Sequence, residues 1–383
     1  MRQEMSNLSH FQAFIPDKNA CIAVGMSGGV DSSVSAYLLK QAGYKVFGIF
    51  MKNWEELFDT GYCSVAEDLQ DAKDICDAIG IKLHTVNFAQ EYREKVFSLF
   101  LEEYKKGRTP NPDVLCNREI KFAQMLDYAL DLGADFLATG HYARRLQWEN
   151  TAALYKGMDK NKDQSYFLQQ LTQNQLKRAI FPLGELEKTY VRKIAEEQKL
   201  STFDKKDSTG ICFIGERPFR EFLEGFLPAQ KGLIKTLDGE IIGEHFGLMF
   251  YTIGQRKGLG IGGIKNASDE PWFVAEKDLE NNVLIVCQGD NDALYHRELS
   301  AENCSWLNEN PLAGGKYFAQ TRYRQADQIC HISYPEKDNI NKIKVIFEAP
   351  QRAITLGQYL AVYDEEGRCL GGGIISERNK IGR

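Results

Sequence analysis

The sequence predicts an α/β protein that begins with a doubly wound parallel sheet, continues with a small central β-rich domain and ends in a β-barrel. Three observations lead to this fold class. Strand-like apolar runs alternate with helical patterns up to about residue 143, as they do in parallel sheets covered by helices. Glycine-rich β-like segments begin near residue 215, and short alternating segments fill the chain from about residue 287. We therefore expect domains over residues 1–215, 216–286 and 287–383.

The N-terminal elements alternate regularly along the chain. Helical patterns place apolar residues three or four positions apart, and two of them end near Gly43 and Gly80. Strands are expected at 20–26, 45–51, 82–88 and 134–143, and helices at 31–44, 64–80, 91–107 and 118–133. Parallel sheets of this kind bind ligands outside the carboxyl ends of their strands. Functional residues are therefore expected in the loops at that edge.

The remainder of the chain is predicted to be β structure. The stretch "PWFVAEKDLENNVLIVCQG" predicts two strands joined by a turn at Asn281 and Asn282. Later segments such as "KYFAQTRYR" and "KIKVIFEAP" are short and alternate in polarity, which is typical of a small barrel or sandwich.

The composition is that of a globular protein without a membrane segment. Of 383 residues, 43% are hydrophobic and 26% are charged, and no apolar run approaches the roughly 18–20 residues of a membrane helix. The N-terminus lacks the apolar core of a signal peptide, so we expect a cytoplasmic protein with no membrane partner. Within a net charge of −6, residues 140–220 hold 15 Lys and Arg against 10 Asp and Glu. Charge alone favours a solvated face there, although a nucleic-acid contact fits the same excess.

The stretch "GMSGGVDSS", residues 25–33, lies between the first strand and the first helix. Glycines let backbone N–H groups approach an anion, and the start of a helix favours negative charge. The stretch lacks the lysine of the G-x-x-x-x-G-K-[ST] phosphate loop and the G-x-G-x-x-G pattern. A serine-rich helix cap is the alternative, but the position after the first strand favours a phosphate site.

The part "SGGVDS" resembles the pyrophosphate loop, or PP-loop, of ATP pyrophosphatases, which split ATP between the α- and β-phosphates. Amidotransferases, argininosuccinate synthetases, tRNA-lysidine synthetases and sulfur-transfer enzymes share this loop. Five further stretches narrow the choice: "GRTPNPDVLCNREIKF", "ATGHYAR", "KDQSYFL", "DSTGICFIGER" and "TIGQRKGLGIGG". With these motifs in this order, the chain resembles bacterial tRNA-specific 2-thiouridylases from about residue 20 to near its C-terminus. The residues before this point look like an unmatched extension.

The resemblance implies an ATP site and a doubly wound sheet of the PP-loop type. Asp31 would help to position Mg²⁺. The residues implied in ATP binding are Gly25, Met26, Ser27, Gly28, Gly29, Val30, Asp31, Ser32, Met51 and Gly140.

Cys116 and Cys212 are the cysteines to which the resemblance assigns sulfur chemistry. Pro110 and Pro112 disfavour a helix around Cys116, so a constrained loop is expected there, just before a helix that begins at about residue 117. The resemblance implies that Cys116 is a nucleophile, that Asp113 is its possible acid–base partner, and that Cys212 carries a persulfide. Release of the sulfur would leave a transient disulfide bond.

Iron–sulfur ligation by Asp113, Cys116 and Cys212 is the alternative use of these residues. The other cysteines have no functional role by resemblance. Core positions are expected for Cys21, Cys76, Cys287, Cys330 and Cys369, and positions near loops for Cys63 and Cys304.

The resemblance also implies tRNA and a persulfide sulfur-donor protein as partners. Three groups of residues would contact the tRNA. They are Asn111, Pro112 and Asp113 near the target base, Lys162, Asp163 and Gln164 in a central contact, and Arg322 and Tyr323 in the last domain. His141 is either catalytic or a hydrogen-bonded structural histidine. The alternatives are another PP-loop adenylating enzyme, similar to tRNA-lysidine synthetases or amidotransferases, or a non-catalytic RNA-binding module.

Overall fold

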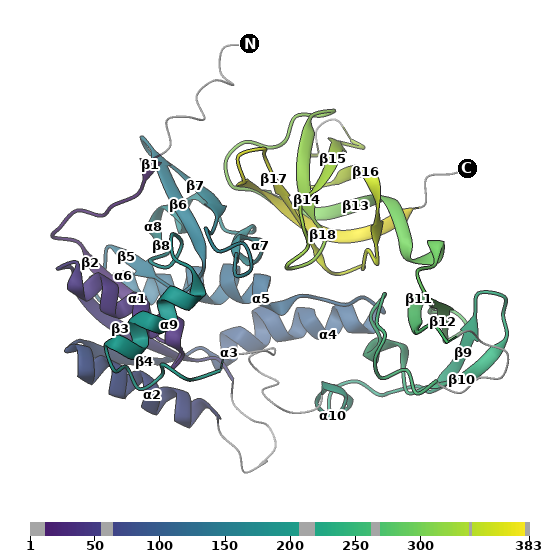
Figure 1. The fold of residues 1–383 in the computed structure, drawn as a ribbon, viewed down its shortest axis with the longest axis horizontal. Helices are drawn as coiled ribbons and strands as arrows, with labels where there is room; N and C mark the ends of the chain where they lie inside the picture. Colours follow the sequence, from purple (N-terminus) through teal and green to yellow (C-terminus); the bar gives the residue numbers. More distant parts are fainter. Residues whose placement is uncertain (1–11, 55–63, 207–218, 262–268, 337–338, 380–383) are drawn as a thin grey trace.

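The computed structural model describes residues 12–54, 64–206, 219–261, 269–336 and 339–379. Figure 1 shows a sheet-and-helix part, a barrel, and a smaller β part that is connected to both. The described strands form three sheets of five, four and nine strands. Within these residues, no helix combines the length and the apolar composition needed to cross a bilayer.

The N-terminal sheet is entirely parallel, as predicted. Its order is β4-β3-β2-β5-β8, with all four pairings parallel. Since β2 is flanked by β3 on one side and β5 on the other, the direction of winding changes at β2, and ligands bind at such a point. The strands are β2 (Cys21–Gly25), β3 (Lys45–Lys52), β4 (Lys82–Asn87), β5 (Phe136–Ala138) and β8 (Ala179–Ile180).

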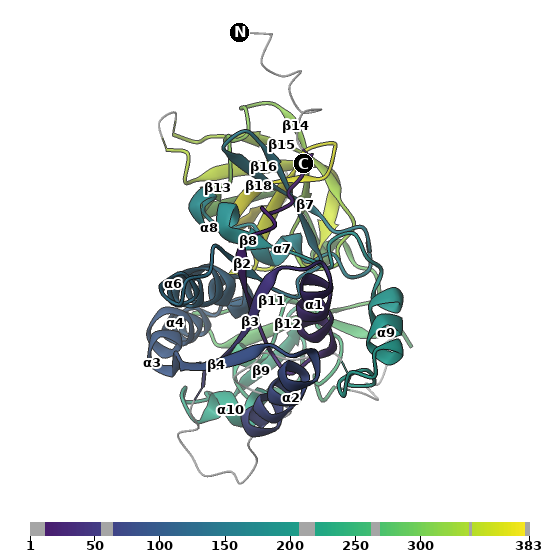
Figure 2. The ribbon, with the colours of Figure 1, turned by 90° about the vertical axis from the view of Figure 1, so that its left-hand side faces the viewer.

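Helices cover both faces of this sheet (Figure 2). On one face lie α1 (Val30–Gln41), α2 (Ser64–Ile79) and α9 (Lys188–Glu197), which share one buried apolar cluster. The other face is covered by helical segments that belong to a second, larger cluster. They are α3 (Ala89–Tyr92), η2 (Arg93–Phe97), α4 (Ser98–Lys105), α5 (Pro112–Leu115), η3 (Cys116–Met125) and α6 (Leu126–Asp131).

The strand expected at 134–143 is wrong in its length. It ends at Ala138, and the chain turns at Gly140 before a hairpin of β6 (Ala143–Trp148) and β7 (Thr151–Lys156). A short strand β1 (Gln12–Ala13) pairs with β6, and β7 pairs with the last strand of the chain. The hairpin therefore joins the N-terminal part to the barrel through backbone hydrogen bonds. Two short helices follow it, α7 (Ser165–Leu168) and α8 (Gln173–Arg178).

The central part is a four-stranded sheet of order β10-β9-β12-β11. The predicted turn between β11 and β12 is confirmed, and Asn282 adopts a φ of 53° there, which asparagine tolerates better than most residues. The elements are α10 (Phe219–Glu224), β9 (Gly232–Thr236), β10 (Ile241–His245), η4 (Leu248–Phe250), β11 (Trp272–Asp278) and β12 (Val283–Gln288).

The C-terminal part is a closed six-stranded barrel. Its strands follow the order β18-β13-β16-β15-β14-β17, and the pairing of β17 with β18 closes the ring. Cys304 lies buried in β13, two residues before the end of this strand. The elements are η5 (Asp292–Leu294), β13 (Tyr295–Trp306), β14 (Lys316–Gln320), β15 (Gln328–Ser333), β16 (Ile343–Arg352), β17 (Tyr359–Tyr363) and β18 (Arg368–Asn379).

Candidate active site

The loop between β2 and α1 lies at the point where the sheet reverses its winding. Gly28 has a φ of 71°, and a Cβ atom there would lie 2.5 Å from the backbone oxygen of Asp68 in α2. Both the backbone angle and the space therefore require glycine. Gly29 precedes the helix in an extended conformation, and no side chain caps the start of α1.

The serines of this loop bind its own backbone. Ser32 Oγ and Ser33 Oγ donate to the Gly29 carbonyl oxygen at 3.0 and 2.9 Å, and the Ser27 N–H donates to Ser32 Oγ at 3.2 Å. These hydrogen bonds hold the shape of the loop. None of them joins a serine hydroxyl to a backbone N–H of the first turn of α1, as an N-cap would. A serine-rich cap is thus not what the structure contains, and the positive end of α1 is suited to an anion.

Gly140 and Met51, the two expected ATP-site residues outside the loop, have different surroundings. A Cβ atom on Gly140 would lie 2.9 Å from the Asp31 carbonyl carbon and 3.0 Å from the Ser32 nitrogen, so glycine permits the close approach of the β5 end to α1. Met51 is half-buried in β3 and packs against the larger apolar cluster. Met26 and Val30 are buried in the cluster on the α1 side, so their side chains serve the packing of this helix against the sheet.

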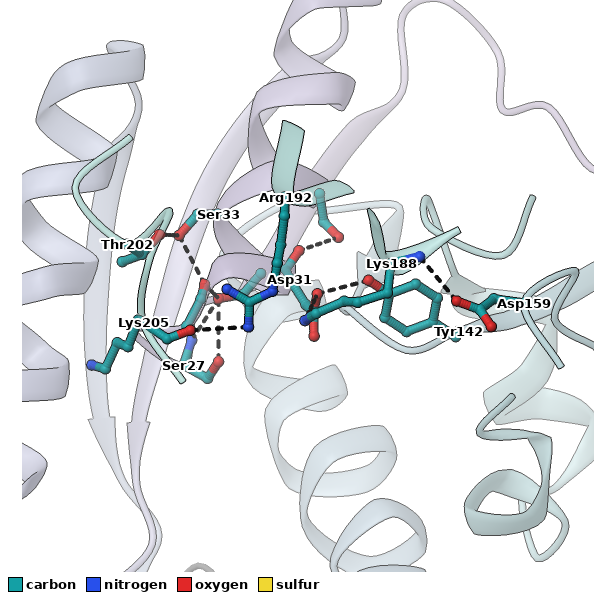
Figure 3. A network of polar contacts seen from close by, with 12 residues as sticks. Ser27, Asp31, Ser33, Tyr142, Asp159, Lys188, Arg192, Thr202 and Lys205 are labelled. Carbon is teal, nitrogen blue, oxygen red and sulfur yellow. Dashed lines mark hydrogen bonds and ion pairs between the residues drawn. The ribbon is translucent and has the colours of Figure 1, made fainter. Parts of the chain in front are cut away.

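Asp31 is the centre of a polar network that the sequence analysis missed (Figure 3). Its Oδ1 atom accepts from the Tyr142 hydroxyl at 2.8 Å and from Lys188 Nζ at 2.7 Å. The Lys188 N–H donates to Asp159 Oδ2 at 3.0 Å. No expected element included Lys188. In the structure it begins α9, where the helix dipole disfavours a cation.

The segment around Cys116 is helical, so the expected loop is wrong. The Asn111 side chain accepts the Asp113 N–H at 3.1 Å as an N-cap, and Pro112 occupies the first helical position. Proline fits there because its missing N–H has no helical partner in any case. Cys116 follows in the second turn and begins η3, a π-type segment with wider turns.

Cys116 is 4% exposed and belongs to the larger apolar cluster. Asp113 lies one turn earlier in the same helix, so both side chains project from one helix face. Desolvation raises the pKa of Asp113, while the charge of Lys121 opposes this shift. A carboxyl group that retains its proton to higher pH is suited to donate it to a leaving group.

His141 is buried between aromatic rings near the same lysine. Its Nδ1 lies 2.7 Å from Thr139 Oγ1, and its ring centroid is 6.1 Å from that of Phe122 and 6.2 Å from that of Phe181. Burial, together with Lys121, moves the pKa of His141 well below its ordinary value. The imidazole is therefore neutral at physiological pH. Its hydrogen bond fits the expectation of a structural histidine.

Residues 162–164 form a turn that packs against the barrel. Asp163 Oδ1 accepts N–H groups of Gly157 and Ser165, and Gln164 Oε1 accepts the Tyr142 N–H at 3.0 Å. Their side chains thus hold the turn together.

Tyr323 of the barrel lies beside this turn. Its ring centroid is 4.4 Å from that of Phe167, and the charges of Lys162 and Asp163 act on its hydroxyl group. Arg322 beside it is exposed. The structure therefore brings together the central contact residues and the barrel residues that the sequence analysis assigned to tRNA.

The described thiols form no disulfide bond with one another. Cys63 and Cys212 lie outside the described residues, so the expected Cys116–Cys212 disulfide has no support in the structure. In the described parts of the chain, no group of three or more His, Cys, Asp or Glu side chains is arranged to hold a metal ion. The alternative of an iron–sulfur cluster held by Asp113, Cys116 and Cys212 includes Cys212 and so lies partly outside the described residues.

Three domain families match the chain in order. Residues 20–216 match the tRNA methyl transferase HUP domain, residues 220–288 the tRNA methyl transferase PRC-barrel domain, and residues 296–375 the aminomethyltransferase beta-barrel domain. The predicted succession of a parallel sheet, a central β domain and a C-terminal barrel is confirmed. Fold and site together define the class: an enzyme with a HUP domain, in which a glycine-rich loop lies where the parallel sheet reverses its winding.

The relatives narrow this class. A tRNA-specific 2-thiouridylase MnmA from Dichelobacter nodosus (strain VCS1703A) is 67% identical over 370 residues, 96% of this chain and 97% of the relative. Another from Stutzerimonas stutzeri (strain A1501) is 58% identical over 364 residues, 94% of this chain and 96% of the relative. The chain belongs to the family of tRNA-specific 2-thiouridylases, as the resemblance of its motifs predicted.

Proposed function

We propose that this chain catalyses the ATP-dependent 2-thiolation of the wobble uridine of tRNA, which yields 2-thiouridine, AMP and pyrophosphate. The observation that carries this proposal is the glycine loop at the switch point, in a chain that is 67% identical to a 2-thiouridylase over nearly its whole length. The reaction takes place in the cytoplasm, where its tRNA substrate is found.

The nucleotide binds with its phosphates at the start of α1. Backbone N–H groups of residues 28–32 hold the phosphates, and Gly140 allows the end of β5 to approach the start of α1 beside them. Met51 lines the nucleoside side at the carboxyl end of β3. Mg²⁺, when bound, neutralises phosphate charge, and the Asp31 carboxylate, with a third of its surface exposed, suits that hard cation.

The uridine O2 atom attacks the α-phosphorus, and pyrophosphate leaves with the electron pair of the broken P–O bond. The terminal sulfur of a Cys212 persulfide then attacks C2 and displaces AMP. The Cys116 thiolate attacks Cys212 Sγ, which leaves the sulfur on the base and a disulfide on the enzyme. A reductant must reopen this disulfide before the next turnover. Asp113, whose pKa is raised by desolvation, supplies or accepts the proton at this site.

The tRNA lies across the N-terminal part and the barrel. Residues 111–113 contact the target base, Lys162, Asp163 and Gln164 form the central contact, and Arg322 and Tyr323 contribute from the barrel. The basic excess of residues 140–220 favours the same side of the molecule. A persulfide-bearing protein supplies the sulfur to Cys212.

Mass spectrometry of tRNA nucleosides tests the proposal after reaction with ATP and a persulfide donor. The expected products are 2-thiouridine and pyrophosphate in equal amounts, and the Cys116→Ser and Cys212→Ser variants should each form none while still binding ATP. Pyrophosphate without thiolated base would indicate another adenylating enzyme. RNA binding without pyrophosphate would indicate a non-catalytic module.

A further inference from the structure

The loop between β2 and α1 contains no lysine, but Lys188 from another helix, α9, reaches Asp31 beside it. We propose that Lys188 is a phosphate-binding residue: its ammonium group leaves Asp31 and binds the β- and γ-phosphates when ATP occupies the loop. This inference rests on the proposed nucleotide site. It assigns to α9 the charge that ordinary phosphate loops carry within their own sequence.

The position of Lys188 supports this role. Its Nζ atom is 2.7 Å from Asp31 Oδ1, and Asp31 lies in the first turn of α1, whose N-terminus faces the loop (Figure 3). The Lys188 backbone is fixed by the hydrogen bond to Asp159 Oδ2. The long side chain alone therefore has to move to transfer the ammonium group from the carboxylate to an anion beside it.

The burial of the two partners is unequal. The Lys188 side chain is 9% exposed, whereas that of Asp31 is 33% exposed. A buried ammonium group is costly without an anion beside it. Asp31 meets this requirement in the free enzyme. When nucleotide is bound, the phosphates beside Asp31 meet it instead.

Neighbouring cations are engaged elsewhere. Lys205 pairs with Asp68 at 2.8 Å and also with Asp71. The Arg192 guanidinium group donates to the carbonyl oxygens of Phe203 and Lys205, both at 3.2 Å. Lys188 is thus the cation of this network whose partner belongs to the PP-loop helix itself.

The test measures binding of pyrophosphate and of AMP to the full chain by calorimetry, with EDTA present to remove divalent cations. Lys188→Met should weaken pyrophosphate binding at least tenfold and change AMP binding less than twofold. Lys156→Met is the matched control because Lys156 also pairs with an aspartate, Asp327, and lies 4.0 Å from the ring centroid of Tyr363. The control should bind pyrophosphate as the wild type does.

Asp31→Asn separates a phosphate ligand from a structural ion pair. This variant keeps the Lys188 ammonium group but removes its competitor, so it should bind pyrophosphate at least as tightly as the wild type. The double variant Asp31→Asn/Lys188→Met removes both charges of this ion pair and should bind pyrophosphate at least tenfold more weakly than Asp31→Asn. Equal binding by these two variants would overturn the inference even if Lys188→Met fails to fold. Absence of pyrophosphate and ATP binding by the wild type would instead overturn the proposed function.

Discussion

Two helices begin at the candidate site, and they begin in opposite ways. At α1, a glycine precedes the helix and no side chain caps it. At α5, Asn111 caps the helix and Pro112 fills its first position. The N-terminus of α1 has its backbone N–H groups available to a ligand anion, whereas the N-terminus of α5 satisfies its own.

The segments that lead into the two helices differ as well. The loop before α1 is held by contacts within the N-terminal part. The segment before α5 is held by the other parts of the molecule. The Thr109 N–H donates to the Leu356 oxygen at 2.9 Å, Gln358 Nε2 donates to the Thr109 oxygen at 2.8 Å, and Lys277 Nζ donates to the Gly107 oxygen at 3.0 Å. One helix start thus has no side-chain cap, as the proposed phosphate site requires. The other is built to place Asp113 and Cys116 where three parts of the molecule meet.

The largest effect is expected from damage to the uncapped start. In Gly28→Ala, the new methyl group would lie 2.5 Å from the Asp68 oxygen, at a φ of 71°. The loop must shift, and we expect affinity for a non-hydrolysable ATP analogue to fall more than about a hundredfold, since charge-assisted hydrogen bonds to the phosphates are lost. Calorimetric titration measures this.

Gly133→Ala is the control for this prediction. Gly133 also has a positive φ, 89°, but a Cβ atom there meets nothing within 4 Å. It should cost about 1 kcal/mol in the free energy of unfolding and leave nucleotide affinity unchanged. Equal losses of affinity in both variants would mean that backbone strain, not the loop shape, governs binding.

A smaller effect is expected from removing the cap at the second start. Asn111→Ala should lower the free energy of unfolding by about 1 kcal/mol and leave ATP affinity unchanged, as measured by urea unfolding and calorimetry. Asn111→Ser keeps a capping oxygen and should retain the stability. If both variants thiolate tRNA slowly, Asn111 contacts the base in addition to capping the helix. Loss of ATP affinity in Asn111→Ala would contradict the separation of the two helix starts.

The smallest effect concerns the pH dependence of stability at Asp113. Burial raises its pKa above the usual 3.8, so above about pH 4 the folded state holds a proton that the unfolded chain has lost. The free energy of unfolding therefore falls as the pH rises through this window. Asp113→Asn cannot ionise, so it should unfold at a higher temperature than the wild type at pH 7, with the gap closing toward pH 4. Asp127→Asn changes an exposed aspartate in α6 and should show no gap.

Local patterns predicted the parallel sheet because its strands and helices succeed one another along the chain. The same reasoning failed at Pro112, where a residue that breaks helices internally instead begins one. It also extended the strand that begins near residue 134 to 143, although the strand ends at Ala138. The pairing of Asp31 with Lys188 spans 157 positions, and only the packing of α9 beside α1 brings these charges together. No local pattern carries that information.

The pairing of β7 with β18 has a consequence for synthesis of the chain. Leu154 and Tyr155 of β7 pair with Arg368 and Cys369, which belong to the last described strand of the chain. While the ribosome is still at work, that edge of β7 presents unpaired backbone groups of a kind that recruit other chains. The nascent N-terminal part thus remains prone to misassembly until the barrel emerges, and a truncation that removes β18 would leave the protein with a permanently open edge.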